Sequence, residues 1–187
     1  MLENVQQILD EFKANVINEA RNNLKSGLNR KYPIDASGKL SKSLKANVKE
    51  SKNSIELTFS MEDYGIFQDV GVKGTKKGRS IRGFSYKSKG GKRGLKGMPP
   101  PSAFDKWSIR KGIAPRDKEG RFINRRSLNF LIARKVFHEG IQPSLFFTRP
   151  FNKYFKQLPQ ELAEKYGLDM IELFDQITEE SFKKLAK

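Results

Sequence analysis

The sequence predicts an α+β fold in which a small antiparallel sheet is packed by an N-terminal helix and by further helices. The first observation is that apolar residues recur every three or four positions near the N-terminus and again in the C-terminal half, as they do in amphipathic helices. The second is that apolar and polar residues alternate in two runs between Leu44 and Ser60, as they do in half-buried strands. A length of 187 residues is enough for one domain with a substantial core.

An amphipathic helix is expected over roughly Leu2 to Lys25, ended by Ser26-Gly27. Because an isolated helix is only marginally stable in water, its apolar stripe must pack on another element, and the strands offer the nearest apolar face. A turn at Ser37-Gly38 follows, after which Leu40 and Leu44 are expected to pack on this first helix. The stripe consists of Leu2, Val5, Leu9, Phe12, Val16, Ala20 and Leu24.

A hairpin from about Leu44 to Ser60 is the clearest local prediction. Ile55, Leu57 and Phe59 form the apolar face of its second strand, and Ser51 to Asn53 suit a short turn between the strands. The hairpin is therefore the expected sheet of this fold.

The segment after the hairpin is expected to be one or two turns of helix packed under it, with a short strand as the alternative. Its apolar residues are Tyr64, Ile66, Phe67 and Val70, and Gly71 then provides backbone freedom at the exit. From there the chain is expected to make a long excursion and to return to the same core.

The excursion begins with a basic loop over residues 73–101, whose richest part, Lys73 to Lys96, we call the basic arm. The arm has no acidic residue, so it repels itself and should be extended or disordered when isolated. It is expected to order on nucleic acid or on an acidic protein face; the alternative is a solvated loop without a specific target. Phe84 and Tyr86 could stack on bases. The cations expected to make the contacts are Lys73, Lys76, Lys77, Arg79, Arg82, Lys87, Lys89, Lys92, Arg93 and Lys96.

Two helices are expected after this loop. The first is short, runs from Ala103 to Lys111, and contains Trp107 as an anchor in the core. A turn over Asp117 to Gly120 leads to the second, which runs from about Ser127, as its N-cap, to His138 and is ended by Gly140. The apolar face of the second helix includes Leu128, Leu131, Ile132 and Val136.

The chain is then expected to return to the core as an extended segment over Gln142 to Phe151, which is too short for a helix before Pro150. A helix is expected from Phe151 to Tyr166, where Pro159 either kinks it or begins a second piece.

Gly167 is expected to break this helix, and a C-terminal helix from Leu168 follows. That last helix covers the core or packs against a neighbouring subunit. Residues 156–187 are accordingly a C-terminal helical extension of a domain over residues 1–155.

Composition and charge indicate which partners to expect and which sequence features are absent. The formal net charge of +16 and the isoelectric point near 10.0 predict an acidic partner, which is nucleic acid, an anionic protein surface or, in third place, a membrane. The chain has no cysteine, so no disulfide framework is expected. The mixed-charge N-terminal segment does not fit a signal peptide, and no apolar run approaches the roughly 20 residues that span a bilayer.

No catalytic, cofactor-binding or metal site is expected. His138 is the single histidine, and without a second histidine or a cysteine a zinc site or a Ser-His-Asp triad has no supporting residues. Glu50, Ser51 and Lys52 form an E-x-K triplet with Asp35 upstream, but it falls at the hairpin turn, where its side chains point into water. No phosphate-binding loop with a G-x-x-x-x-G-K-[ST] pattern is present.

Several short motifs follow one another in a set order. Ser37 to Leu44 reads SGKLSKSL, Tyr64 to Gly71 reads YGIFQDVG, and Gly140 to Phe151 reads GIQPSLFFTRPF. This order resembles that of the tail-completion, or head-tail joining, proteins of tailed bacteriophages, and the resemblance covers roughly Leu2 to Phe155. Gly65 stands where that family usually has alanine. The residues that carry the resemblance, and that it places in the core, are Leu40, Tyr64, Phe67, Gly71, Trp107, Phe146, Phe147 and Pro150.

The resemblance implies a structural virion protein that is no enzyme and needs no cofactor. Members of that family form a homo-oligomeric ring at the neck, between the portal or its adaptor and the tail, and DNA passes through the ring. It implies as partners further copies of this chain, the portal or adaptor, tail proteins and genome DNA, after synthesis in the host bacterial cytoplasm.

Two other interpretations stay open. A free nucleic-acid-binding protein would use the arm Lys73 to Lys96 for phosphate contacts. A metal-dependent nuclease would need Glu50.

Overall fold

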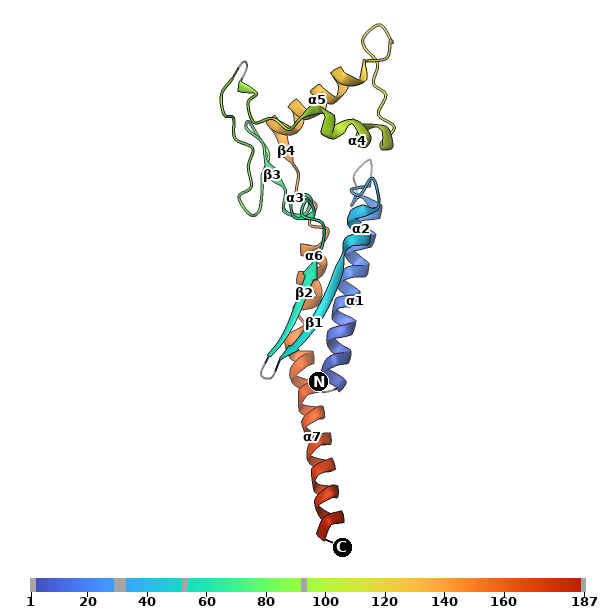
Figure 1. The fold of residues 1–187 in the computed structure, drawn as a ribbon, viewed down its shortest axis with the longest axis vertical. Helices are drawn as coiled ribbons and strands as arrows, with labels where there is room; N and C mark the ends of the chain where they lie inside the picture. The colour runs from blue at the N-terminus through green and yellow to red at the C-terminus, as the bar shows by residue number, and fades with distance from the viewer. Residues whose placement is uncertain (1–2, 29–32, 52–53, 92–93, 186–187) are drawn as a thin grey trace.

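The structure is a computed structural model that describes residues 3–28, 33–51, 54–91 and 94–185. The fold is α+β, as predicted, with seven α-helices in the described part and a small two-stranded antiparallel sheet packed by the N-terminal helix and others. Figure 1 shows an elongated molecule with two lobes. We call residues 3–70 and 142–185 the body lobe and residues 71–141 the excursion lobe.

The N-terminal helix α1 spans Glu3–Ser26 and buries the predicted stripe. Its buried residues are Val5, Leu9, Phe12, Val16, Ala20 and Leu24, while Leu2 lies outside the described residues. The short helix α2 (Lys39–Ser43) follows a turn in which the Asp35 carboxylate accepts hydrogen bonds from the backbone N–H groups of Gly38 (2.9 Å) and Ser41 (2.7 Å). This turn directs Leu40 and Leu44 onto Ala20 and Leu24, as predicted.

The sheet of the body lobe is the predicted hairpin, formed by β1 (Lys45–Ser51) and β2 (Ser54–Ser60). Ala46 lies opposite Phe59 and Val48 opposite Leu57. Because paired residues point to the same side of a sheet, the apolar side chains share one face. Leu57 and Phe59 pack there against a cluster formed by Phe12, Val16 and Leu158. The predicted turn residues Lys52 and Asn53 lie outside the described residues.

Helix α6 (Thr148–Phe155) corrects the prediction of an extended segment up to Phe151. Pro150 lies in the first turn of α6, where a backbone N–H has no partner within the helix and its loss costs little. The helix therefore begins before the proline.

Helix α7 (Leu158–Leu185) begins next to Pro159, which confirms the second of the two predicted roles for that proline. The predicted break at Gly167 is wrong, because α7 continues through it. Leu162 on one side of the glycine and Asp169 on the other both contact α1 or its cluster, and this packing outweighs the poor helix propensity of glycine. In Figure 1 α7 extends well past the N-terminus of α1.

The excursion lobe joins the body lobe through a two-stranded ladder. Helix α3 (Gly65–Val70) precedes it at the open end of the hairpin, not under it as predicted (Figure 1). Strand β3 (Val72–Lys73) then pairs antiparallel with β4 (Gly140–Ile141). The chain therefore leaves and re-enters the body lobe at one place, which confirms the predicted excursion and return.

Between β3 and β4 lie the 3-10 helix η2 (Pro101–Phe104), helix α4 (Asp105–Arg110) and helix α5 (Arg125–Glu139). Asn124, not the predicted Ser127, caps α5, because its side-chain oxygen accepts a hydrogen bond from Arg126 N at 2.9 Å. Gly140 ends α5 as predicted. The predicted apolar face of α5 is wrong for Leu131, which is 41% exposed; the buried residues are Leu128, Asn129, Ala133 and Phe137.

Candidate functional site

The charge of this protein is divided unequally between the two lobes. Residues 71–141 contain 20 Lys and Arg against four Asp and Glu, which is a net charge of +16. The remaining residues contain 17 of each kind and are neutral overall. The excursion lobe, at one end of the elongated molecule in Figure 1, therefore carries the whole excess.

The first half of the basic arm is folded onto α5. The backbone N–H of Lys73 donates to the Phe84 carbonyl at 2.8 Å, and its carbonyl accepts from Tyr86 N at 2.8 Å. The N–H groups of residues 75–77 donate to carbonyl oxygens in the last turn of α5, two of them to His138 (3.0 and 3.1 Å). These carbonyls have no partner within the helix, so the arm caps α5. The arm was predicted to be extended or disordered when isolated, and within the chain these hydrogen bonds hold its first half against α5.

Two glycines permit this close approach. A Cβ at Gly74 would lie 2.2 Å from the carbonyl oxygen of His138, and a Cβ at Gly78 would lie 2.1 Å from that of Glu139. Gly78 also has a φ of 93°, which favours glycine. The backbone of the arm can lie against α5 because neither position carries a side chain.

The two aromatic residues of the arm are engaged within the chain. Phe84 packs edge-on against Phe67, with ring centroids 5.0 Å apart, and Tyr86 against Phe137 at 6.0 Å. Burial raises the pKa of the Tyr86 phenol. Stacking on bases was predicted for these two rings, but in this structure each of them packs against another aromatic ring of the chain.

The cations of the arm point to solvent. The described ones are exposed, namely Lys73, Lys76, Lys77, Arg79, Arg82, Lys87, Lys89 and Lys96, while Lys92 and Arg93 lie outside the described residues. Lys77 Nζ lies 3.0 Å from Glu139 Oε1, and its hydrogen bond lowers the pKa of that carboxyl.

A second set of cations lies on α4, α5 and the loop between them. These residues were not predicted as a site because apolar and acidic residues interrupt them in the sequence. A charge count over a longer window would have found them. All of these side chains except the half-buried Lys111 are exposed. They are Lys106, Arg110, Lys111, Arg116, Lys118, Arg121, Arg125, Arg126, Arg134 and Lys135.

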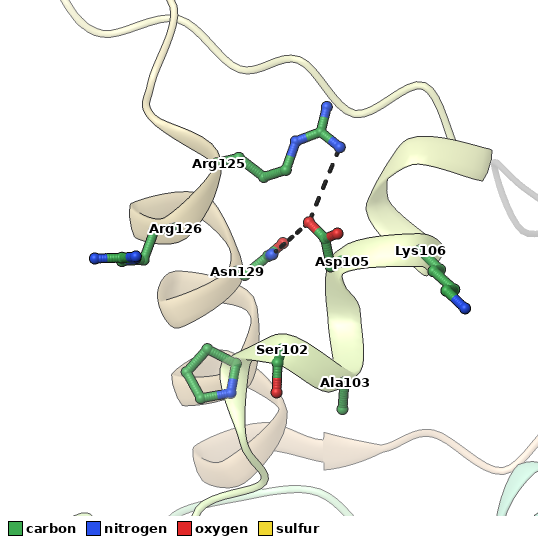
Figure 2. Close-up of a pocket in the computed structure, with 8 residues that line it drawn as sticks. Ser102, Ala103, Asp105, Lys106, Arg125, Arg126 and Asn129 are labelled. Carbon is green, nitrogen blue, oxygen red and sulfur yellow. Dashed lines mark hydrogen bonds and ion pairs between the residues drawn. The ribbon is translucent and has the colours of Figure 1, made fainter.

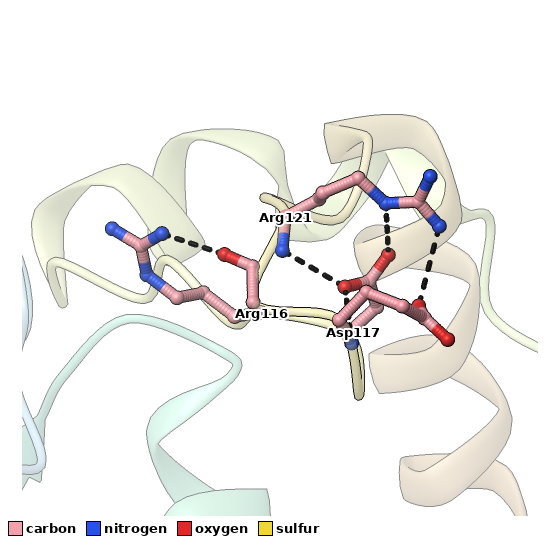
Figure 3. A network of polar contacts seen from close by, with 5 residues as sticks. Arg116, Asp117 and Arg121 are labelled. Carbon is pink, nitrogen blue, oxygen red and sulfur yellow. Dashed lines mark hydrogen bonds and ion pairs between the residues drawn. The ribbon is translucent and has the colours of Figure 1, made fainter.

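The turn between α4 and α5 is held by its own charges (Figure 3). Asp117 accepts hydrogen bonds from the backbone N–H of Arg121 at 2.8 Å and from its side-chain Nε at 3.1 Å. The backbone bond, with these side-chain contacts, lowers the pKa of Asp117. Arg121 also pairs with Glu119 at 3.2 Å, and Arg116 lies 4.0 Å from the centre of the Phe122 ring. The predicted turn is confirmed.

An open pocket of about 820 Å³ lies between η2, α4 and the start of α5 (Figure 2). Asn129 Nδ2 donates to Asp105 Oδ1 at 3.1 Å, and Ser108 Oγ donates to Asn129 Oδ1 at 3.2 Å. Arg125 lies 3.9 Å from Asp105. Among the described residues, the four acidic side chains of the excursion lobe pair with Lys77, Arg121 and Arg125, so four negative charges face the 20 positive charges of the lobe.

The residues considered for catalysis do not form a site in the described part of the chain. His138 Nδ1 lies 3.0 Å from Thr75 Oγ1, a contact that joins the arm to α5. No group of three or more histidine or acidic side chains that could hold a metal ion occurs among the described residues. Lys52 and the side chain of Glu50 are outside that description.

The residues that carry the family resemblance divide into two groups. Leu40, Gly71, Phe146 and Pro150 are buried and Phe147 is half-buried. The expectation that the rest lie in the core is wrong, because Tyr64, Phe67 and Trp107 are 41%, 38% and 38% exposed. Trp107 instead lines a pocket of about 440 Å³ with residues of α5 and with Pro33-Ile34.

Across the described residues, no helix has the length and apolar character needed to cross a membrane. Comparison with known proteins finds no family model, no curated protein and no solved structure that matches this chain.

Proposed function

We propose that this chain is a structural subunit of the neck of a tailed bacteriophage, in a ring that joins the portal or its adaptor to the tail and through which DNA passes. The observation that carries the proposal is the division of charge, with +16 on the excursion lobe and none in excess on the rest. The order of motifs from Leu2 to Phe155 supports the choice of family.

The positive charge of the excursion lobe would allow it to contact DNA that moves through a channel. Duplex DNA carries one negative charge per about 1.7 Å of its axis, and cations on exposed side chains hold phosphates without reading sequence. Because several copies would present the lobe around one duplex, weak contacts would add up by multivalency. The neutral body lobe, with its long helices, would face protein neighbours.

The test is electron microscopy of particles from a phage in which this gene is disabled and then complemented. Without the gene, filled heads lacking tails or heads that have leaked their DNA are expected. The wild-type gene should restore tailed, filled particles. A variant without four arm charges should not restore them, although it folds, because these side chains are exposed and no described residue pairs with them. Its substitutions are Arg79→Gln, Arg82→Gln, Lys87→Gln and Lys89→Gln.

A matched control removes four exposed charges from the body lobe with Lys42→Gln, Lys45→Gln, Lys49→Gln and Lys156→Gln, and it should restore normal particles. Circular dichroism of both variants separates a lost contact from a lost fold. Normal, infectious particles in the absence of the gene would remove the neck proposal and leave a free nucleic-acid-binding protein as the leading alternative.

A further inference from the structure

One face of α7 has an acidic and apolar character and lies away from the rest of the chain. α7 packs towards α1 through Leu158, Leu162 and Asp169. On the other side, five exposed residues follow one another at alternating intervals of three and four, so they share a face. We call this the acidic face: Glu161, Glu164, Leu168, Ile171 and Asp175. Leu168 and Ile171 are 48% and 59% exposed.

The outer side of α5 has the complementary character. Arg126, Phe130 and Arg134 are spaced by four residues, and Ser127 and Leu131 lie beside them. We call these five residues the basic face. A pocket of about 410 Å³ is lined by four of them together with Pro101. The guanidinium groups of Arg126 and Arg134 make no hydrogen bond or ion pair with described residues, and Arg126 points away from Asp105 in Figure 2.

The two faces carry opposite charges, and on each of them an apolar pair lies between two charged residues. On α7 the apolar pair lies between Glu164 and Asp175, eleven positions or about 16 Å apart along the axis. On α5 the pair Phe130 and Leu131 lies between Arg126 and Arg134, about 12 Å apart. The long arginine side chains can cover this difference. Docking would bury the apolar pairs against each other and place a carboxylate beside each guanidinium.

We propose that the acidic face of α7 docks on the basic face of α5 in a second copy of this chain. The second copy is required because α7 extends away from the excursion lobe, and α5 lies at the opposite end of the molecule in Figure 1. Such a contact joins different surfaces on the two subunits, so it repeats head to tail and closes into a ring when the rotation permits. The inference deepens the proposed neck ring and rests on it for its biological setting.

The test is a charge exchange, measured by analytical ultracentrifugation of the full chain at low and high salt. Wild-type protein should associate at low salt and dissociate at high salt, because partly exposed ion pairs are screened. The variant Glu164→Arg/Asp175→Arg and the variant Arg126→Glu/Arg134→Glu should each lose association. An equimolar mixture of the two should regain it, since each altered face then meets its opposite. Recovery in the mixture also shows that both variants are folded.

Controls with the same charge changes elsewhere are Glu56→Arg/Asp63→Arg and Lys42→Glu/Lys49→Glu, all at exposed positions of the body lobe, and both should associate like the wild type. A wild type that stays monomeric at every salt concentration would overturn the inference. So would association that both double variants retain, which would place the ring contact elsewhere and leave the neck proposal standing. Charge exchange that succeeds while phage particles form normally without the gene would keep the interface and remove the neck proposal.

Discussion

Asp169 of α7 caps the first turn of α1 by accepting hydrogen bonds from Asn4, 165 positions earlier in the chain. Its Oδ1 accepts from Asn4 N at 3.2 Å and from Asn4 Nδ2 at 2.8 Å, and its Oδ2 accepts from Val5 N at 3.1 Å. The first N–H groups of a helix have no partner within it, and a negative charge there is favoured by the helix dipole. One carboxylate thus ties the two longest helices of the body lobe together.

Replacing this carboxylate should weaken the protein in a pH-dependent way. Burial acts to raise the pKa of Asp169, but the hydrogen bonds from Asn4 and Val5 together outweigh it and lower the pKa. A carboxyl with a lowered pKa stabilises the fold above its unfolded pKa of about 3.9, and this contribution is lost as the pH falls through the folded pKa. Asp169→Ala should therefore lower Tm at neutral pH, and the difference from wild type should shrink below about pH 4. Thermal unfolding across pH checks this.

The control for that experiment is Asp175→Ala, an exposed position on the same helix. With both variants measured at high salt, where the contact proposed for the acidic face is screened, it should leave Tm close to wild type at every pH. An equal loss in both variants would show that helix charge, and not the cap, is responsible.

Asp69 is the second buried carboxylate on which the packing depends. It accepts hydrogen bonds from Phe147 N at 2.8 Å, from Thr148 N at 3.2 Å and from the Thr148 hydroxyl, at the start of α6. Asp69→Ala leaves buried donors without a partner and should lower the free energy of unfolding by about 1–3 kcal/mol or more. Urea denaturation measures the loss. Asp63→Ala, at an exposed position nearby, should change it by less than about 0.5 kcal/mol, and a similar loss there would contradict the assignment.

Two glycines should respond in opposite directions to the same substitution. Gly74→Ala places a Cβ against the His138 carbonyl and should displace the arm from α5, with a clear loss of stability. A Cβ at Gly167 meets nothing within 4 Å and lies inside α7, so Gly167→Ala should stabilise the protein by about 1 kcal/mol. Destabilisation by Gly167→Ala would show that the helix is interrupted there after all. Thermal unfolding of both variants is sufficient.

The exposed cations of the excursion lobe should give the protein a salt-dependent affinity for DNA. Each phosphate contact contributes about 0.9 to the slope of log affinity against log salt concentration. Arg79→Gln/Arg82→Gln should therefore reduce the slope by up to about 2, for duplexes of any sequence. Lys42→Gln/Lys45→Gln on the body lobe should leave it unchanged. Fluorescence anisotropy with two unrelated duplexes measures both, and equal slopes for all three proteins would exclude the arm as a DNA contact.

The spacing of apolar residues correctly predicted the core-facing side of α1 and of the hairpin. The stripe from Val5 to Leu24 and the alternation around Leu57 and Phe59 predicted α1 and the hairpin, because burial selects apolar residues at the repeat of the element itself. The same signal was misleading for Leu131. Leu131 belongs to the apolar repeat of α5, but its side chain is exposed. The buried side of α5 instead includes the polar residue Asn129, which is hydrogen-bonded to Ser108 and Asp105.

The candidate site could be predicted only in part. The arm from Lys73 to Lys96 is contiguous, so composition alone indicated it. The cations from Lys106 to Lys135 are spread over two helices and a turn. They join the arm in one lobe because β3 pairs with β4 and because the arm is hydrogen-bonded to the end of α5.

By itself, the sequence determined the α+β class, the stripe of α1, the hairpin and the strong positive charge of the arm, because each depends on neighbours within a few residues. The tertiary structure decided that α7 runs through Gly167, that α6 includes Pro150, that Trp107 is half-exposed and that the arm caps α5. These outcomes depend on contacts such as Asp169 with Asn4 and residues 75–77 with the end of α5, whose partners lie far apart in the chain. Their energies outweigh local propensities, which amount to about 1 kcal/mol for a glycine in a helix.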